Sequence, residues 1–396
     1  MAEDEPLIEE DLEQALDDLK GNRNWAEGAV LWSTDWTAET VLSQLTRNNI
    51  DLDPSFQRRS AWTDTKQSLF IESLILGLPI PQLILADAKG KKGAFIVIDG
   101  KQRLLAIRRF CSNDPDGEFK PLKLKGLKEL SRLNGKTYAD LIASEEFAED
   151  RAAFENASIR TVVIRAWQDE EYLYEVFLRI NTGSVQLSPQ ELRQALHPGP
   201  FSKFVGDASA DSIELKRALN LSEPDFRMRD AEILLRYIAY RNFIGEYSGN
   251  LKQFLDDATK NLNASWGAKE AEVNEQVAEM ERALVFTREA FGEKQYLRKW
   301  NGEDFESRKN RAVFDIMLHY FSQPEIRANL SEKHAEVVGK FKALCENNAA
   351  FRSSIETTTK SVESNRARFN IWGDAVAELS EVDVSDLKFP ENNVVG

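Results

Sequence analysis

Apolar and polar residues follow two different periods along the first half of the chain, one typical of helices and one typical of strands. After Thr63, apolar residues recur at three- and four-residue spacing as far as Gly77, which predicts a helix between them. Residues 82–86 and 94–98 are β-rich runs on either side of a turn rich in Gly and Lys, so they predict a β-hairpin. Residues 98–107 predict the end of that second strand, a tight glycine turn and a helix start.

The next segments continue this mixture of strands and helices. Residues 159–167 are another β-rich run and predict a third strand, whereas residues 170–180 follow the helical period. Ser188, Pro189 and Glu191 have the spacing of a capping box. In this box Ser188 caps the following helix, Pro189 takes its first position and Glu191 reaches back to the cap.

The second half of the chain shows the helical period in almost every segment, so we place a domain boundary near residue 200. We expect an α+β fold with an acidic tail over residues 1–30, an α+β domain over residues 31–199 and a mostly α-helical domain over residues 200–396. The segments with the strongest helical period are 231–243, 251–262, 268–291, 307–321, 332–346 and 365–380.

The composition is that of a globular protein. The chain has 396 residues, of which 42% are hydrophobic and 30% charged, and this usage excludes a disordered or fibrous chain. No stretch approaches the roughly 18 apolar residues of a membrane span, and the acidic start lacks the basic and apolar parts of a signal peptide. We therefore expect a cytoplasmic protein without membrane contacts. Two cysteines are too few for a disulfide framework or a four-thiolate zinc site.

The net charge of −15 is unevenly distributed. Residues 1–20 hold nine acidic residues and one lysine, and they supply −8 of it. Such a run is typical of a solvated tail, with a DNA-mimicking or partner-docking role as the alternative. Residues 120–136 have the opposite sign, because a single acid stands among six basic residues. This segment is a candidate surface for the DNA backbone, and a solvated loop face is the alternative. Its basic residues are Lys120, Lys123, Lys125, Lys128, Arg132 and Lys136.

The turn from Asp99 to Arg103 has the most informative chemistry. The N-terminus of the helix after Gly100 offers backbone N–H groups and the positive end of the helix dipole, which together favour an anion. Gly100 allows a ligand to approach the backbone closely, and Lys101 and Arg103 add positive charge. Asp99 can order a divalent metal, a ribose hydroxyl or a water molecule. A plain strand-to-helix turn with its arginine in a surface ion pair is the alternative reading.

Three segments, in this order along the chain, resemble the motifs of one known family. They are Gln57-Arg58 followed by Trp62, the box Asp99-Gly100-Lys101-Gln102-Arg103, and the run Phe177-Leu178-Arg179-Ile180-Asn181-Thr182-Gly183 that continues to Glu191. Together they resemble the GmrSD-type N-terminal domain family, which has a ParB/sulfiredoxin-like fold and a DGQQR box. Weaker similarity continues into the helical half, so that the ordered motifs cover roughly residues 36–375.

The resemblance implies a sensor subunit of a prokaryotic DNA restriction or phage-defence system. Such a subunit would bind a nucleoside triphosphate with Mg²⁺, would hydrolyse it, and would sense DNA. By position in the motif, Gly100, Lys101 and Arg103 would hold the phosphates, Asp99 and Gln102 would be catalytic, and Asp99 would bind the metal. The other phosphate-binding residues that the resemblance implies are Gln57, Arg58, Arg179, Asn181 and Glu191.

The chain departs from the family in two respects that bear on its activity. Lys101 replaces the glutamine that the family commonly has, so it would either strengthen phosphate binding or displace a group that positions water. The three histidines, His197, His319 and His334, are too widely spaced for the His-Asn-His nuclease core of many relatives. We therefore expect a separately encoded effector.

Two other functions remain open at this point. One is a metal-dependent DNA nuclease in the ParB-like pocket, and the other is a non-enzymatic adaptor that binds DNA under the control of a nucleotide. The base of the nucleotide and the formation of homo-oligomers are also left open.

Overall fold

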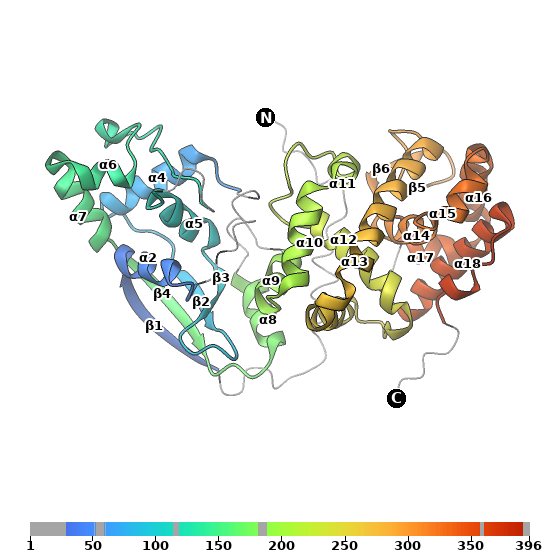
Figure 1. The fold of residues 1–396 in the computed structure, drawn as a ribbon, viewed down its shortest axis with the longest axis horizontal. Helices are drawn as coiled ribbons and strands as arrows, with labels where there is room; N and C mark the ends of the chain where they lie inside the picture. Colours follow the sequence, from blue (N-terminus) through green and yellow to red (C-terminus); the bar gives the residue numbers. More distant parts are fainter. Residues whose placement is uncertain are drawn as a thin grey trace. The chain divides into compact units, whose positions relative to one another are not determined.

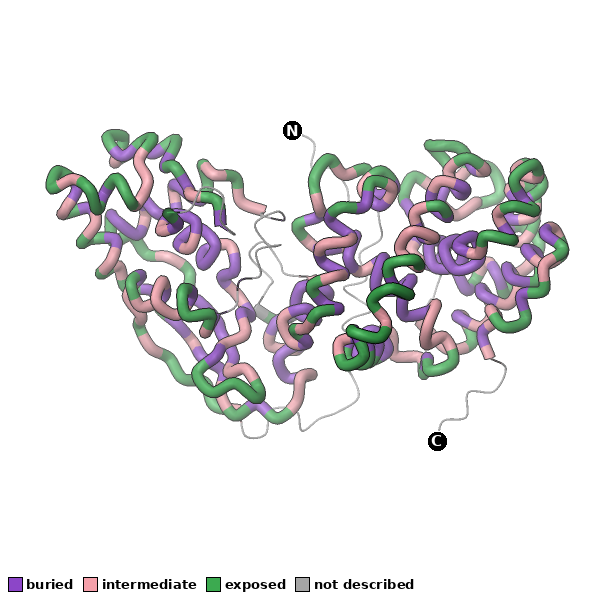
Figure 2. Tube along the Cα trace, viewed as in Figure 1, coloured by how far each residue is buried: buried purple, intermediate pink, exposed green. Residues whose placement is uncertain are grey.

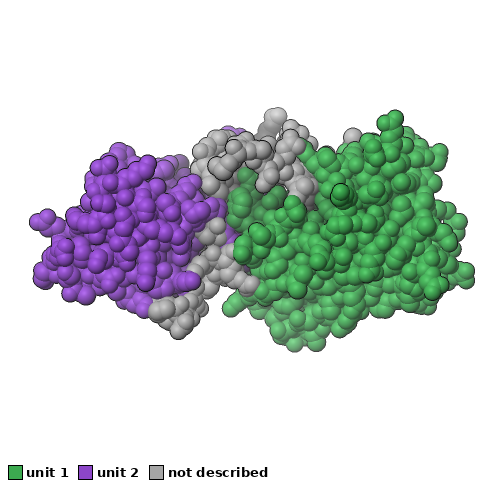
Figure 3. All heavy atoms as spheres, turned by 90° about the horizontal axis from the view of Figure 1, so that it is seen from above, with its two compact units in different colours: residues 1–20, 197–396 green, residues 21–196 purple. Residues whose placement is uncertain are grey.

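The computed structural model describes residues 29–50, 52, 59, 61–113, 119–180, 188–356 and 360–390. Contacts within the chain divide it into two units, with the division between Leu196 and His197, and Figure 3 colours the units separately. The N-terminal unit combines a sheet with helices, and the C-terminal unit is helical apart from one short hairpin. Both the mixture of α and β structure and the helical second half agree with the sequence prediction.

The N-terminal unit contains a four-stranded sheet with β1 at one edge (Figure 1). Strand β4 runs antiparallel to β1 and parallel to β2, and β2 and β3 form the predicted hairpin. The three predicted strands are therefore confirmed. The edge strand β1 was not predicted, because most of its side chains are exposed and its sequence lacks a clear alternation. In spatial order the strands are β1 (Val30–Thr37), β4 (Ser158–Arg165), β2 (Leu83–Asp87) and β3 (Phe95–Asp99).

The helices of the N-terminal unit bury a hydrophobic core against this sheet. The core includes Leu104, Leu105 and Ile107, which are completely or almost completely buried, and each contributes about 1.5–3 kcal/mol by leaving water. The predicted helix after Thr63 is confirmed, and the Thr63 side chain accepts a hydrogen bond from the N–H of Lys66. The helices are α2 (Ala38–Thr46), α4 (Asp64–Ile75), α5 (Lys101–Phe110), α6 (Tyr138–Ala143), α7 (Ala148–Asn156), α8 (Glu170–Ile180) and α9 (Pro189–Leu196).

Helices α8 and α9 both pack against strand β3. The predicted capping box at the start of α9 is confirmed. The Ser188 hydroxyl accepts the N–H of Glu191 at 3.1 Å, and a carboxylate oxygen of Glu191 accepts the N–H of Ser188 at 2.8 Å. This reciprocal cap fixes the first turn of α9 and the direction of the Glu191 side chain.

The C-terminal unit is built around two buried helices, α12 and α14, whose traces are largely purple in Figure 2. Every residue of α14 after Arg311 is buried. No helix among the described residues is long and apolar enough to cross a membrane. The helices are α10 (Pro200–Asp211), α11 (Ile213–Ala218), α12 (Arg229–Phe243), α13 (Leu251–Phe291), α14 (Arg311–Phe321), α15 (Pro324–Leu330), α16 (His334–Asn347), α17 (Ala349–Glu356) and α18 (Val362–Ser380).

The helical period of residues 251–262 and 268–291 is confirmed, and both segments belong to the single 41-residue helix α13. The glycine between them, Gly267, lowers helix stability by only about 1 kcal/mol. Burial of Leu262 and Trp266 next to it favours continuation of the helix and outweighs that loss.

The prediction for residues 307–321 is wrong at its start, because the whole segment was expected to be helical. Residues Phe305–Lys309 instead form strand β6, which pairs antiparallel with strand β5, Arg298–Trp300. Helix α14 begins only after Asn310, whose side chain accepts a hydrogen bond from the N–H of Val313 at 3.0 Å. The asparagine cap therefore separates the strand from the helix.

Candidate functional site

The DGKQR box joins strand β3 to helix α5. Asp99 is the last residue of β3, Gly100 is the N-cap of α5, and the following residues form the first helical turn. Gly100 has φ +102° and ψ 11°, a left-handed conformation that glycine adopts readily and that residues with a Cβ atom rarely adopt. A Cβ atom at this position would also overlap the Leu83 side chain of strand β2. Backbone conformation and packing therefore both require glycine.

The start of helix α5 has the properties of an anion site. No side chain caps the helix, and its first backbone hydrogen bond runs from the Leu104 N–H to the Gly100 carbonyl at 2.9 Å. The N–H groups of a first helical turn have no partner within the helix, and they carry the positive end of the helix dipole. A negatively charged group next to Gly100 is therefore favoured.

Arg103 folds back across the turn and is held by two hydrogen bonds. Its Nη2 donates to Oδ2 of Asp99 at 2.6 Å, and its Nη1 donates to the carbonyl of Gln82 at 2.9 Å. The arginine is buried, and the Asp99 side chain is 18% exposed. The charge of the guanidinium is thus balanced by Asp99, and an anion that binds here must share Arg103 with this carboxylate.

Lys101 is balanced in the same way by a residue of helix α9. Its Nζ lies 2.7 Å from Oε1 of Glu191, and both residues are buried. The other carboxylate oxygen of Glu191 accepts the N–H of Ser188, so the capping box directs Glu191 toward Lys101. The structure therefore brings Glu191 to the box. Lys101 reaches a phosphate only when its ion pair with Glu191 opens.

The remaining residues that the sequence assigned to this site have different environments. Gln102 is half-buried in the first turn of α5. Arg179 lies near the end of α8, where its exposed guanidinium donates to Glu175 of the same helix at 2.6 Å. Gln57, Arg58 and Asn181 lie outside the described residues, as do residues 1–28 of the predicted acidic tail.

The basic segment of residues 120–136 buries its leucines in the core and is held by hydrogen bonds to helix α4, while most of its basic side chains are exposed. The side chains of Arg132 and Lys125 are occupied by ion pairs, with Asp150 and Asp64 respectively, the latter at 3.1 Å. Burial raises the pKa of Asp64, but its hydrogen bonds and charge interactions with Arg109 and Lys125 outweigh this effect and hold the pKa below its ordinary value. The lysines predicted to bind DNA, Lys120, Lys123, Lys125 and Lys128, are all exposed.

Three polar residues of α4 hold this segment in place, and the sequence analysis missed them. The Ser68 hydroxyl accepts the N–H of Lys125 at 3.1 Å. The buried Glu72 carboxylate accepts the N–H groups of Glu129 and Leu130 at 2.9 and 2.8 Å. Together with Asp64, these residues are spaced by four, so they share one face of the helix. A polar stripe of this kind on an otherwise apolar face is the signal that could have revealed them.

His319 and His334 have separate partners in the C-terminal unit. Nε2 of His319 donates to the carbonyl of Leu387 at 2.7 Å, and burial lowers the pKa of His319 to about 4. The ring of His334 packs edge-on against Phe286, with centroids 5.2 Å apart. Burial raises the pKa of the Cys111 thiol far above its ordinary value, so this thiol is inert at neutral pH.

Comparison with known protein families gives a match to the N-terminal unit. Residues 39–198 match the family described as GmrSD restriction endonuclease, N-terminal domain. The match begins within α2 and ends after α9, so it contains the DGKQR box, the basic segment and Glu191. No curated protein and no solved structure matches the chain. The match supports a component of a restriction or phage-defence system, and residues 39–198 carry a domain of the GmrSD-type restriction endonuclease N-terminal family.

Proposed function

We propose that the N-terminal unit binds the phosphates of a nucleoside triphosphate at the DGKQR box. The observation that carries this proposal is the start of α5 at Gly100, which no side chain caps and beside which Lys101 and Arg103 are buried. Helix N-termini with adjacent arginine or lysine are common phosphate sites. We further propose a ParB/sulfiredoxin-like fold for this unit, and a role as the nucleotide-hydrolysing sensor that acts with a separately encoded effector in restriction or phage defence.

Phosphate binding at this site is an exchange of ion partners. Arg103 would turn from Asp99 to a phosphate oxygen, and the helix N-terminus would stabilise the remaining negative charge. Asp99 is then available as a single carboxylate ligand for Mg²⁺. A single carboxylate fits Mg²⁺ beside phosphate oxygens, which is how this ion is commonly bound with nucleotides. The ion would neutralise phosphate charge, and Gln102, in the first turn of α5, would orient the attacking water.

The exposed lysines of the basic segment are the proposed DNA contact. Lys123 and Lys128 have exposed side chains on a backbone that Glu72 and Ser68 hold against α4. Because this backbone is anchored, the lysines present their charge without ordering a loop first. Each phosphate that they neutralise releases counterions, so DNA affinity should fall steeply with salt concentration.

A second candidate function is a nucleotide-gated adaptor that binds DNA without turnover. The two ion pairs, Lys101 with Glu191 and Arg103 with Asp99, favour it, because they occupy the charged groups that would otherwise serve a hydrolytic reaction. They favour a metal-dependent nuclease less, since such an enzyme needs Asp99 for its metal while Arg103 lies 2.6 Å from that carboxylate.

Calorimetric titration of the full chain with ATP, GTP, CTP and UTP plus Mg²⁺ tests the proposed site. We expect at least one nucleotide to bind, and Arg103→Gln to weaken it by about tenfold or more, as for other charge-assisted hydrogen bonds. Arg108→Gln is the matched control on the same helix, because Arg108 packs on the Phe119 ring and lies outside the box. It should leave nucleotide affinity within about twofold.

Two results would overturn the site assignment: no binding of any nucleotide to folded protein, or equal affinities for wild type and a folded Arg103→Gln variant. Release of inorganic phosphate separates the candidate functions, because turnover identifies an NTPase and binding without turnover identifies an adaptor. Nicking of plasmid DNA that requires Mg²⁺ and disappears in Asp99→Asn would identify the nuclease instead.

A further inference from the structure

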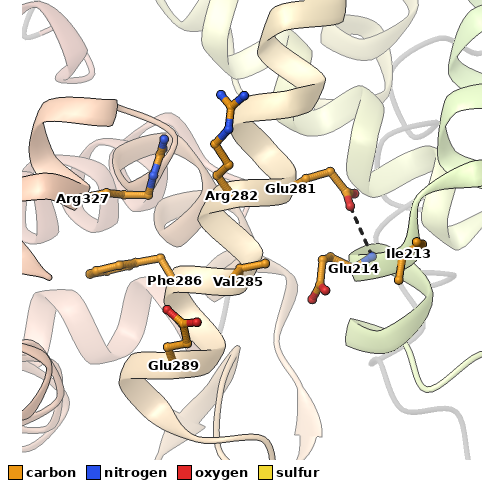
Figure 4. Close-up of a pocket in the computed structure, with 8 residues that line it drawn as sticks. All are labelled: Ile213, Glu214, Glu281, Arg282, Val285, Phe286, Glu289 and Arg327. Carbon is orange, nitrogen blue, oxygen red and sulfur yellow. Dashed lines mark hydrogen bonds between the residues drawn. The ribbon is translucent and has the colours of Figure 1, made fainter.

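The C-terminal unit has a surface groove that lies outside the family match. Its cavity of 520 Å³ is formed by helices α11, α13 and α15 (Figure 4). Val285 and Phe286 of α13 supply apolar surface in the groove, and Figure 4 shows Val285 between Phe286 on one side and Glu214 on the other. Ile213 of α11 also lines it and is 67% exposed. Such a large exposed aliphatic side chain beside a cavity is typical of a surface that another molecule covers.

The arginines that line the groove are already neutralised within the chain. Arg282 binds Glu279 and also lies 3.3 Å from Glu275. Arg327 binds the same Glu279, and its Nη1 donates to the carbonyl of Phe321 at 2.6 Å. Because both guanidinium groups are occupied, they offer little attraction to a further anion.

Two carboxylates of the groove are not balanced by a cation. Glu281 accepts hydrogen bonds from the Ser212 hydroxyl and the N–H of Glu214, which are neutral donors. Glu289 is exposed, and among the described residues no cationic group lies within 4.0 Å of Glu281 or Glu289. Glu214, in contrast, is paired with Arg217 and Arg288. The charge that remains available in the groove is therefore negative.

The spacing of these carboxylates matches a helical partner. Glu281, Val285 and Glu289 follow one another at intervals of four residues, so they lie along one face of α13. The backbone positions of the two glutamates are about 12 Å apart along the axis, because an α-helix rises 1.5 Å per residue. A partner helix that lies along α13 can match this distance. Two of its basic residues would be seven or eight positions apart, with an apolar residue between them.

We propose that this groove binds a basic amphipathic helix of a partner protein. Its apolar side chains would contact Val285, Phe286 and Ile213, and its lysine or arginine side chains would pair with Glu281 and Glu289. The argument rests on charge complementarity and on the apolar surface between the charges. It is independent of nucleotide binding, because the groove residues belong to the unit after Leu196 and the box belongs to the unit before it.

Fluorescence anisotropy with a labelled synthetic peptide tests this inference. The probe is an 18-residue amphipathic helix of leucine and lysine, compared with the same peptide in which every lysine is replaced by glutamate. We expect the full chain to bind the lysine peptide and Glu289→Lys to weaken this binding by about tenfold, which corresponds to 1.4 kcal/mol. The glutamate peptide should bind at least about tenfold more weakly than the lysine peptide, because it repels both carboxylates.

Glu270→Lys is the matched control for general charge attraction. Glu270 is also exposed on α13 but lies 19 residues before Glu289, which is about 28 Å along the helix. Its reversal changes the net charge of the protein equally and should leave peptide affinity within about twofold. The inference is wrong if the two reversals weaken binding equally, if both peptides bind equally well, or if the lysine peptide does not bind.

Discussion

The ion pair between Lys101 and Glu191 should be strongly coupled, and a double-mutant cycle can measure the coupling. Lys101→Met removes the cation and retains most of the volume of its side chain. Glu191→Gln removes the negative charge but retains an oxygen that can accept the N–H of Ser188. Each single substitution leaves the charge of the other residue buried without its partner, whereas the double variant leaves no charge at all.

The size of the effect follows from the distance and the burial of the pair. At 2.7 Å and an effective dielectric constant of about 20, the attraction between the two charges is about 6 kcal/mol. Their side chains are only 9% and 5% exposed, so desolvation cancels much of this attraction in the intact pair. Removal of one partner leaves the desolvation cost uncompensated. We therefore expect each single substitution to lower the free energy of unfolding by about 3–5 kcal/mol, and the double variant by clearly less than the sum.

Hydrogen exchange followed by mass spectrometry is the appropriate assay, because the chain has two units and need not unfold in one step. Peptides from α5 and α9 report the opening free energy of the N-terminal unit within the full chain. Arg160→Met is the control in the same unit. Arg160 lies 3.2 Å from Asp35, but both side chains are 54% exposed, so its loss should lower stability by less than about 1 kcal/mol.

Two results would refute this reasoning. One is that neither Lys101→Met nor Glu191→Gln lowers the free energy of unfolding more than Arg160→Met does. The other is a double variant whose effect equals the sum of the single effects. Either result would mean that Lys101 and Glu191 are not coupled in solution, and that Lys101 is available to a phosphate without the opening of an ion pair.

Three further predictions concern stability and local order. Gly100→Ala should destabilise the N-terminal unit by more than about 1 kcal/mol in thermal unfolding, because its left-handed backbone disfavours any Cβ. Glu72→Gln should speed hydrogen exchange at residues 128–130, whose N–H groups its carboxylate accepts. The low pKa of about 4 for His319 means that the unfolded chain binds the extra proton first as pH falls. Stability should therefore fall by roughly 3 kcal/mol between pH 6.5 and pH 4 through this group. Urea titrations at several pH values measure this loss. His319→Gln should reduce the fall in unfolding free energy between pH 6.5 and pH 4, and His334→Gln should leave it unchanged.

The sequence predicted the elements around the box because their signals are local. The cap at Thr63, the glycine at position 100 and the box from Ser188 to Glu191 each act within a few residues of the chain. Such signals can be read without knowledge of the fold. The continuity of α13 could not be read in this way, since it depends on tertiary burial of Trp266 and its neighbours.

The partners of the charged residues in the site were much harder to predict. Glu191 lies 90 residues after Lys101, and only the packing of α9 against β3 brings the two together. The second partner of Arg103 is the backbone carbonyl of Gln82. Because every residue has a backbone carbonyl, the sequence contains no signal for this contact. The family resemblance predicted that these charged residues belong to one site, but it did not predict that they would neutralise one another.

The different burial of the two ion pairs indicates which cation a phosphate would reach first. Glu191 is held on one oxygen by Lys101 and on the other by the N–H of Ser188, and its side chain is 5% exposed. Asp99 is more accessible, at 18%, and Arg103 lies next to the uncapped helix start. A phosphate therefore displaces Asp99 at a lower cost in free energy than it displaces Glu191. Substitution of Arg103 should accordingly reduce nucleotide affinity more than stability, and substitution of Lys101 should do the reverse.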